Sequence, residues 1–432
     1  MSTNLNPCQP NPPGPGPGPG HGHGHGHGHG HGPNPNPNGC TGTCCPANAP
    51  VSSFPLGATS TNYGNSVLLA TGEFIFSLDL LSTQSIGAGS WGFSLNYLSN
   101  NGVDDIAGLY WNYSQNYQLT QLPNGDIVLI TPDNLQETFI YNGNGQWMSG
   151  YNSTQATLVE INAGTSNDAF ILTSNTGTVT EFFGFYSSIT TPGRMKSTTD
   201  RYGNSQTFTW AATAGVVQLT SVTDAYGRTI NYAYYGSTGG HLLSQITDFL
   251  GRQVNFQYDS AGHLIAVVLP SINNAAPGNT YPNGTAYVFQ YDTGNSDPNR
   301  QNDLIKIWYP NETLPYINSS RVVDTASVYA NATPRYVIAY GQTSTALNYG
   351  AVVSETVGDP ASGVGGTYTF TYSNTGLPSN IIDPSDPIVS QTTMTDRNGN
   401  VKIFNFNYNG MVVWLTIGSL GSMILLGRPV LL

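Results

Sequence analysis

Hydrophobic and polar residues alternate with a period of two over many short segments of this chain. Leu219-Thr220-Ser221-Val222 and Ile230-Asn231-Tyr232-Ala233-Tyr234 are two such segments, separated by a polar stretch. This alternation predicts β-strands that bury one face and expose the other. Similar runs occupy residues 243–246, 254–259, 263–268, 287–292, 304–308, 368–372 and 403–408. The pattern predicts an all-β protein built as an antiparallel meander of tandem β-hairpins.

A polar phrase, Thr-Asp-x-x-Gly-(Asn/Arg), lies between these runs. Its aspartates stand at positions 200, 224 and 248, a constant interval of 24 residues. Asp can accept hydrogen bonds from backbone N–H groups ahead of it in a turn, and Gly three residues later can take a positive φ. Related phrases occur at 259 and 396. The residues predicted to form hairpin turns, in a purely structural role, are Asp200, Gly203, Asp224, Gly227, Asp248, Gly251, Asp259, Gly262, Asp396 and Gly399.

The phrase around Tyr258-Asp259 resembles the YD repeat of the Rhs (rearrangement hotspot) family, which is also found in teneurins. The best copy, 256–264, reads aromatic-x-Tyr-Asp-x-x-Gly-x-Leu. Residues 65–74 are similar to the phrase N-x-V-x-x-A-T-G-E of that family's N-terminal region, and 108–113 and 136–139 stand where its next phrases usually follow. The resemblance covers roughly residues 60 to 410, as expected of a repeat array that is recognised by spaced phrases.

The resemblance implies a spiral β-sheet of the kind that closes into a hollow shell, often around a toxic C-terminal domain released by autoproteolysis. This chain has few repeats, lacks the Asp-Pro-x-Gly phrase that ends the shell, and shows no toxin domain after it. It resembles only the N-terminal segment of such a protein. We therefore expect part of a YD-shell-like sheet, and we do not expect cargo encapsulation or self-cleavage.

Composition separates four regions. Residues 1–50 are predicted to be a disordered Pro/Gly/His-rich tail, 51–190 an N-terminal Rhs-type β region, 191–410 the YD-repeat hairpin array, and 411–432 an apolar tail. Charged residues are 8% of the chain and aromatic residues 11%, so polarity comes mainly from uncharged side chains. A net charge of −12 with only 12 Lys and Arg excludes a basic face for nucleic acid.

The N-terminal tail carries the only candidate metal ligands. Six imidazoles and a group of thiols could bind a divalent metal, or the tract could be a spacer whose metal affinity is adventitious; we favour the spacer, because flexible binding needs no evolved geometry. No other cofactor is expected. The tail leaves the redox state of the cysteines open. The candidate ligands are His21, His23, His25, His27, His29, His31, Cys40, Cys44 and Cys45.

The two ends bear on localisation. Residues 1–10 contain no cleavable secretion signal, so a surface or secreted protein would need another export route. Residues 411–427 form an uncharged, mostly apolar run, near the minimum length of a membrane span. Three interpretations of this run remain open: a short membrane anchor, a buried hydrophobic terminus, or a tail produced by a reading-frame change.

Candidate catalytic groups are weak. The turn aspartates are explained by turn formation, and the histidines of the β body, His241 and His263, are interpreted as solvated or strand-end residues. Trp91, Trp111, Trp147 and Trp210 could stack on sugar rings or fill the sheet interior, and the second use is favoured.

The sequence therefore predicts a non-enzymatic structural or surface-interaction protein that contacts protein or glycan. An alternative is the N-terminal part of a toxin-delivery polypeptide whose enzymatic domain is missing, and another is metal binding by the tail. The open edge of an unclosed meander predicts self-association, pairing with another chain, or burial by the C-terminal tail.

Overall fold

The structure is a computed structural model of the 432-residue chain. It describes residues 66–86, 90–100, 104–132, 136–149, 156–186, 191–213, 216–236, 241–273, 280–374, 390–407, 412–419 and 422–426. All of them belong to one compact unit, Ser52–Leu432. Strands make up 54% of the structure and helices 7%, so the prediction of an all-β protein is confirmed.

A small sheet near the start of the described chain has the order β1-β2-β3-β6. Its strands are β1 (Val67–Leu68), β2 (Glu73–Thr83), β3 (Trp91–Leu98) and β6 (Trp111–Tyr113). The short pair β4 (Asp104–Asp105) and β5 (Gly108–Leu109) lies between β3 and β6 in the chain.

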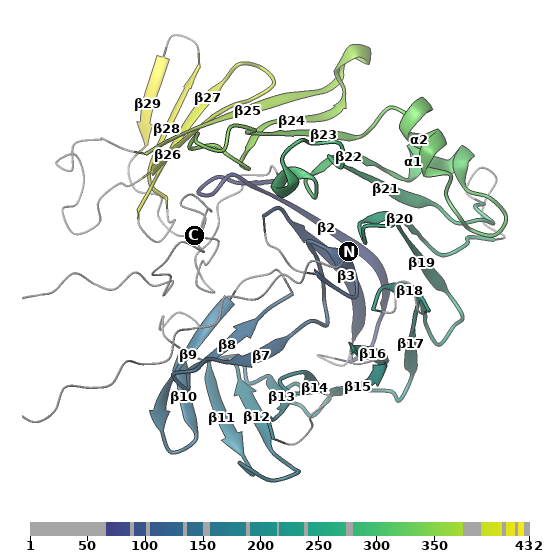
Figure 1. Cartoon of the computed structure of the whole chain (residues 1–432), viewed down its shortest axis with the longest axis vertical. Helices are drawn as coiled ribbons and strands as arrows, with labels where there is room; N and C mark the ends of the chain where they lie inside the picture. Colours follow the sequence, from purple (N-terminus) through teal and green to yellow (C-terminus); the bar gives the residue numbers. More distant parts are fainter. Residues whose placement is uncertain are drawn as a thin grey trace, which may run out of the picture. The chain divides into compact units, whose positions relative to one another are not determined.

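A large sheet follows, in which each strand pairs antiparallel with the next strand along the chain from β7 to β29 (Figure 1). Its strands are β7 (Gln118–Gln121), β8 (Ile127–Ile130), β9 (Gln136–Gly143), β10 (Gln146–Ser149), β11 (Thr157–Ile161), β12 (Ala169–Thr173), β13 (Val179–Phe183), β14 (Met195–Thr199), β15 (Ser205–Thr213), β16 (Val216–Thr223), β17 (Thr229–Tyr234), β18 (Leu243–Thr247), β19 (Gln253–Tyr258), β20 (Leu264–Val268), β21 (Ala286–Tyr291), β22 (Leu304–Trp308), β23 (Tyr336–Tyr340), β24 (Val352–Asp359), β25 (Val364–Asn374), β26 (Ser390–Thr395), β27 (Val401–Phe406), β28 (Val412–Ser419) and β29 (Ser422–Leu426). The sheet is not closed. The predicted antiparallel meander is thus confirmed.

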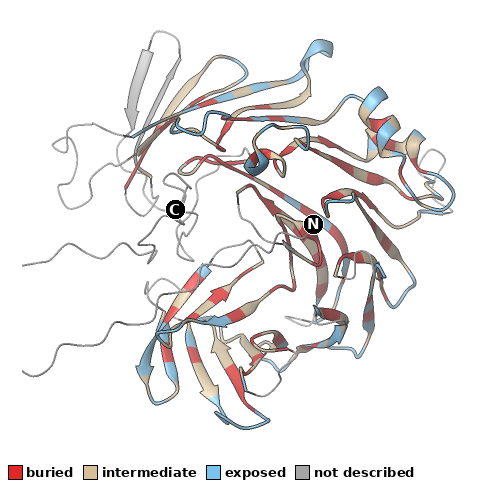
Figure 2. Ribbon diagram, viewed as in Figure 1, coloured by how far each residue is buried: buried red, intermediate tan, exposed pale blue. Residues whose placement is uncertain are grey.

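The period of two in the sequence sets which side chains face inward. In β17, Ile230 and Tyr232 are buried while the residues beside them are exposed. Tyr232 lies opposite Ile246 of β18, and Ile246 lies opposite Val254 of β19. Because directly opposed residues share a face, one continuous apolar face results. Figure 2 shows buried positions along the strands and exposed positions at hairpin ends such as that of β11 and β12.

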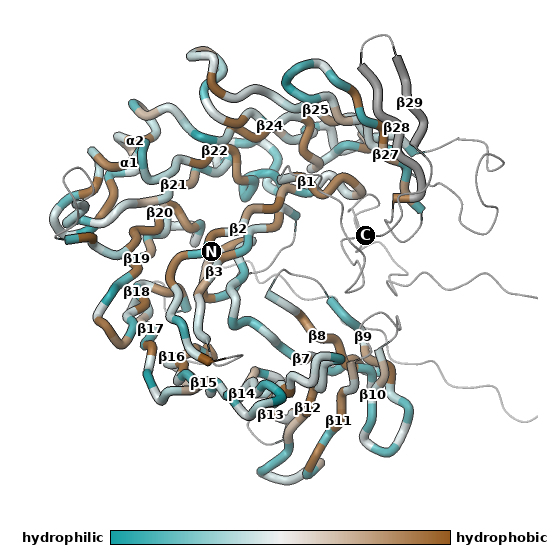
Figure 3. Tube along the Cα trace, turned by 180° about the vertical axis from the view of Figure 1, so that it is seen from behind, coloured by the Kyte–Doolittle hydropathy of each residue, from teal (hydrophilic) through white to brown (hydrophobic). Residues whose placement is uncertain are grey.

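The inner face of the meander packs on β2, β3 and β6. Trp91 donates its indole N–H to the hydroxyl of Tyr232 at 3.1 Å, and Trp111 donates to the hydroxyl of Tyr291 at 2.7 Å. Phe93 packs edge-on against Phe256, with centroids 6.0 Å apart. These residues belong to one hydrophobic core, and Figure 3 shows the hydrophobic stretches of β2 and β3.

The tryptophans considered for sugar stacking are therefore mainly core residues. Trp91, Trp111 and Trp147 are buried, and Trp210 is half-buried with its N–H bonded to the carbonyl of Met195 at 2.7 Å. The favoured interpretation, that they fill the sheet interior, is what the structure shows.

A helical insertion between β22 and β23 covers part of the opposite face. It contains α1 (Pro310–Thr313), η3 (Leu314–Tyr316) and α2 (Thr325–Asn331). Val328 of α2 and Trp308 of β22 join a second buried cluster with residues of β20 and β21. The short helices η2 (Pro298–Arg300) and η4 (Pro360–Ser362) lie in other connections. The strands β20 to β22 are thus covered on both faces.

The apolar C-terminal segment contributes strands to the meander. β28 pairs with β27, and β29 pairs with β28. Beyond residue 410, the backbone of β28 and β29 therefore continues the sheet. Within the part of the chain that the structure describes, no helix is long and apolar enough to span a membrane. Residues 1–50, with all candidate metal ligands, lie outside the described residues.

Repeat turns and a candidate binding groove

The turn that joins β16 to β17 shows why the repeat contains Asp and Gly. One carboxylate oxygen of Asp224 accepts hydrogen bonds from the backbone N–H groups of Tyr226 and Arg228, at 2.9 and 3.0 Å. The other oxygen accepts from the Arg228 side chain at 2.7 Å. Gly227 has a φ of 75° and donates its N–H to the carbonyl of Asp224 at 2.9 Å. Asp224 thus stabilises the turn through hydrogen bonds to backbone and side chain at once.

The same arrangement recurs at the other predicted turns. Each aspartate accepts from the N–H groups two and four residues ahead, and its second oxygen contacts the side chain four residues ahead. The aspartates and these partners are Asp200 with Asn204, Asp248 with Arg252, Asp259 with His263, and Asp396 with Asn400. The glycines at 203, 251, 262 and 399 all have positive φ.

Two turn arginines also connect the meander to the inner sheet. Arg228 donates to the carbonyl of Gln84 at 2.6 Å, and Arg252 donates to the carbonyl of Ser82 at 2.9 Å. Both carbonyls lie at or just beyond the end of β2. The side chain four residues after the aspartate therefore stabilises the turn and also joins two sheets. This double role explains why these two copies of the repeat have Arg at that position.

Electrostatics at Asp224 follow from these contacts. Burial raises the pKa of its carboxyl, but hydrogen bonds from the Arg228 side chain and from the Arg228 and Tyr226 backbone outweigh this effect, so the pKa is lower than usual. The ionised carboxylate is thus the form that the folded turn stabilises.

Three further turns share this backbone geometry without the full sequence phrase. In each, the first residue donates its N–H to the carbonyl four residues ahead and accepts from the N–H three residues ahead. These turns are Leu122–Asp126, Ser174–Thr178 and Asn318–Val322. A Gly at the fourth place marks the first two, at 125 and 177, and could have identified them.

The third of these turns departs from the pattern, because Arg321 occupies the glycine position with a φ of 59°. Its guanidinium donates to the carbonyls of Gln253 and Leu269, both at 2.8 Å. Asn318 takes the place of the aspartate and accepts from the N–H groups of Ser320 and Val322. A non-glycine residue with a left-handed backbone is strained. At Arg321 the side chain nevertheless joins the insertion to the sheet through these two hydrogen bonds.

His263 is buried, which corrects its interpretation as a solvated residue. It is 2% exposed and stacks on Tyr291 with centroids 4.6 Å apart. Its ring nitrogens contact Asp259 at 2.7 Å and Asn302 at 2.8 Å. His263 immediately precedes β20, so its placement at a strand end is correct.

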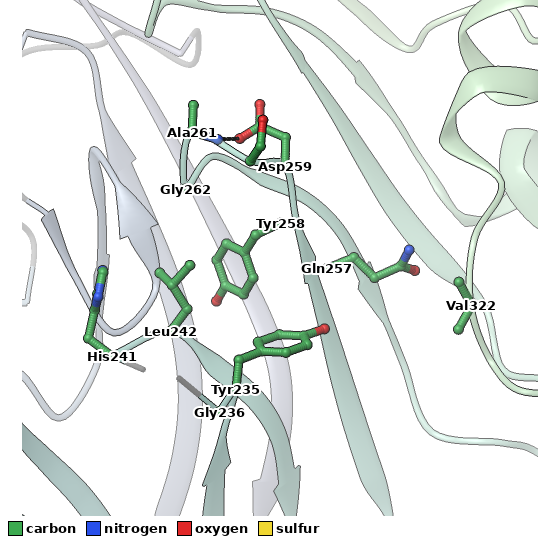
Figure 4. A pocket seen from close by; sticks show the side chains of 11 residues that line it. Tyr235, Gly236, His241, Leu242, Gln257, Tyr258, Asp259, Ala261, Gly262 and Val322 are labelled. Carbon is green, nitrogen blue, oxygen red and sulfur yellow. Dashed lines mark hydrogen bonds between the residues drawn. The ribbon is translucent and has the colours of Figure 1, made fainter. Parts of the chain in front are cut away.

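A groove lies beside the β19–β20 turn. One part, with a volume of about 770 Å³, is bordered by the connection from β17 to β18 and by the turn at 259–262 (Figure 4). A second part, of about 280 Å³, continues along β17, β18 and β19 to Arg321 and Val322. Tyr235, Gln257 and Val322 line both parts.

Two tyrosines form the centre of this groove. Tyr235 is 41% exposed, and its hydroxyl donates to the carbonyl of Phe256 at 2.6 Å. Its ring meets Tyr258 edge to face, at 6.0 Å and 88°. In Figure 4 these rings lie between His241 and Leu242 on one side and Gln257 and Val322 on the other. Burial raises the pKa of both hydroxyls, so both stay protonated near neutral pH.

Uncharged amides form the floor of the second part. Gln245 donates to the side-chain oxygen of Asn255 at 2.9 Å, which directs the Asn255 amide group. Gln257 accepts from the N–H of Val323 at 2.8 Å and donates to its carbonyl at 3.2 Å, as a neighbouring strand would. The groove therefore offers an aromatic ring, an apolar side chain and amides held in place by hydrogen bonds.

The predicted turn residues are not gathered at one site. Asp259 and Gly262 border the groove, whereas the turns at 200, 224, 248 and 396 lie on the opposite edge of the sheet, because strand direction alternates at every step of an antiparallel meander. Among the described residues, no group of three or more His, Cys, Asp or Glu could hold a metal ion.

Fold and turns together define an all-β protein with a repeated Asp–Gly hairpin turn. No family model matches the chain, and no curated protein matches it.

Solved structures with similarity include the N-terminal domain of the effector protein SpvB from Salmonella typhimurium, at 11% identity over 69% of this chain and 93% of that one, with a TM-score of 0.28. A TcdB2-TccC3-Cdc42 structure matches at 13% identity over 80% of this chain, with a TM-score of 0.23, and the Photorhabdus luminescens Tc holotoxin pore at 11% over 82%, with a TM-score of 0.21. This chain spans 20% of the length of each of the last two.

Proposed function

We propose that this chain is a non-enzymatic scaffold of the Rhs/YD-repeat type that contacts a partner, a glycan in the first instance, through the surface of its hairpin array. The observation that supports this most is the use of the repeat carboxylates. At Asp224 and Asp248 both oxygens accept hydrogen bonds within the turn, and the side chains are fully buried. Turn geometry that recurs in this way builds a rigid support for a surface.

The groove supplies the contact site in this proposal. A sugar ring presents C–H groups on one face and hydroxyls at its edge, so it suits an aromatic ring beside amide groups. Tyr235 provides the ring, and Asn255 provides the amide. A glycan ligand also agrees with action at the cell surface or after secretion.

Glycan binding is tested with immobilised oligosaccharides and the full chain. Tyr235→Ala removes the ring, whereas Tyr235→Phe keeps the ring and removes only the hydroxyl that bonds to Phe256. We expect Tyr235→Ala to weaken binding about tenfold, the equivalent of about 1.4 kcal/mol, and Tyr235→Phe to change it less than threefold. Glycan retention that is equal in Tyr235→Ala and the unmodified chain, both with unchanged urea midpoints, would rule out the groove.

A second contact is proposed at the outer strand β29, which has a paired neighbour on one side only in the described ladders. An outer strand presents backbone N–H and C=O groups that pair with another chain. A second copy of this protein or a different chain would add a strand there.

A further inference from the structure

The edge of the sheet opposite the groove carries the three turns at 200, 224 and 248. They connect β14 to β15, β16 to β17, and β18 to β19, so neighbouring turns are separated by two strands. Each turn projects the two residues between its Asp and its Gly beyond the sheet. The side chains of these residues therefore recur at regular intervals along the edge of the sheet.

Four of the six projecting residues are large, apolar and exposed, and the other two are Arg201 and Ala225. Tyr202 is 75% exposed, Tyr226 57% and Leu250 68%, and Phe249 is 36% exposed. They occupy the middle of turns whose carboxylates and glycines already satisfy the backbone, so turn formation does not require aromatic side chains at these positions. Contiguous exposed apolar residues at one edge mark an interaction surface.

Cation–π contacts order these side chains within their turns and join the turn at 224 to the turn at 248. The guanidinium carbon of Arg228 lies 5.1 Å from the ring centroid of Tyr226 and 4.3 Å from that of Phe249 in the next turn. Arg201 lies 4.8 Å from the ring of Tyr202. Because Arg228 is itself fixed by Asp224 and by the carbonyl of Gln84, its contact with Phe249 holds the turns at 224 and 248 side by side.

The spacing between successive turns in the row is close to the repeat length of a polyproline II helix. Strands in a sheet lie about 4.8 Å apart, so turns two strands apart recur at about 9.6 Å. A polyproline II helix rises about 3.1 Å per residue and repeats after three residues, at about 9.3 Å. A ligand with an apolar residue at every third position would therefore meet Tyr202, then Tyr226, then Phe249 and Leu250.

We propose that this row of turn residues, Tyr202, Tyr226, Phe249 and Leu250, is a docking surface for a proline-rich segment of a partner protein in the polyproline II conformation. Seven residues with proline at the first, fourth and seventh positions span the three turns. Aromatic-lined surfaces bind such segments because the ligand loses little entropy on binding, and tyrosine hydroxyls can donate to its unpaired carbonyls.

The polar groups beside the row favour a peptide over a glycan here. The carboxylates of Asp224 and Asp248 are buried in their turns, and Arg228 and Arg252 are bonded to these carboxylates and to main-chain carbonyls. These four ionic groups are thus already engaged within the protein. The exposed rings of successive turns are then the main groups that can contact a ligand.

The test is a fluorescence-polarisation titration of the full chain with a labelled ten-residue peptide that has proline at every third position. A peptide of the same composition with proline at every second position is the matched ligand control. We expect saturable binding of the first peptide and at least tenfold weaker binding of the second. Tyr226→Ala combined with Leu250→Ala should weaken binding of the first peptide at least tenfold.

Two variants separate this result from a general loss of structure. Tyr186→Ala removes a ring that is 68% exposed but lies outside the row, and it should leave binding unchanged. Tyr226→Phe keeps the ring and should retain most of the affinity. Absence of saturable binding, equal binding of the two peptides, or equal binding by the double variant would overturn the proposal, as would competition by oligosaccharides that bind the row.

Discussion

Replacement of Asp224 tests whether the repeat carboxylate stabilises the fold. Asp224→Ala removes the acceptor for two backbone N–H groups and for the Arg228 side chain, at a position whose side chain is fully buried. Hydrogen bonds to a charged group contribute about 1.5–3 kcal/mol each. Arg228 keeps its bond to Gln84 and its side chain is 28% exposed, so water can replace part of the loss. We expect the free energy of unfolding to fall by about 3 kcal/mol.

Asp224→Asn is the matched control, because Asn318 already forms this turn with an amide oxygen. It should keep both backbone bonds, lose the ion pair, and cost about 1.5 kcal/mol. Urea unfolding measures the totals, and hydrogen exchange at the amides of Tyr226 and Arg228 measures the turn itself. The pKa of Asp224 is lowered by folding, so its contribution is complete above the unfolded pKa and is lost as the pH falls through the folded pKa. An Asp224→Ala chain within about 0.5 kcal/mol of the unmodified protein, with protected amides, would refute the reasoning.

Three other predictions concern separate features. Burial raises the pKa of Asp303 to about 7 despite Arg300 nearby, so the unfolded chain releases this proton at lower pH than the folded chain. The free energy of unfolding should therefore fall as pH rises from about 4 to 7. Asp303→Asn should reduce this pH dependence in urea unfolding at a series of pH values, and an unchanged dependence would contradict the raised pKa of Asp303. Arg321 has a φ of 59°, so Arg321→Ala should be about 1 kcal/mol less stable than Arg321→Gly, and equal urea midpoints would show that the backbone carries no strain. Removal of residues 411–432 moves the outer edge of the described sheet from β29 to β27, so the full chain and the shortened chain should both self-associate in sedimentation velocity, and a monodisperse monomer of the full chain would contradict the proposed contact at β29.

The hairpin array was predictable because its information is local. Alternation placed the strands 219–222 and 230–234 within β16 and β17, and the predicted runs 287–292 and 304–308 overlap β21 and β22, which pair with each other. The aspartate and glycine types specify a turn within five residues, and no distant contact is needed.

Features that depend on distant residues were not predictable. Nothing near Arg228 indicates that its guanidinium reaches the carbonyl of Gln84. The polar setting of His263 suggested solvent, but Tyr291 covers the ring and Asn302 binds it. The turn at Asn318 was missed because Arg321 replaces the expected glycine. The guanidinium of Arg321 binds the carbonyls of Gln253 and Leu269, which are distant in sequence. The groove was missed because the insertion, distant in sequence, supplies Val322 to both of its parts.

The interval of 24 residues corresponds to two strands of the meander. Duplication or loss of one such block would therefore return the backbone to the same edge, heading in the same direction, with its apolar side chains still pointing inward. A change by a single strand would send every later turn to the wrong edge. The array can thus grow or shrink over evolutionary time in whole blocks, and the number of rings along its rim would change by one with each block.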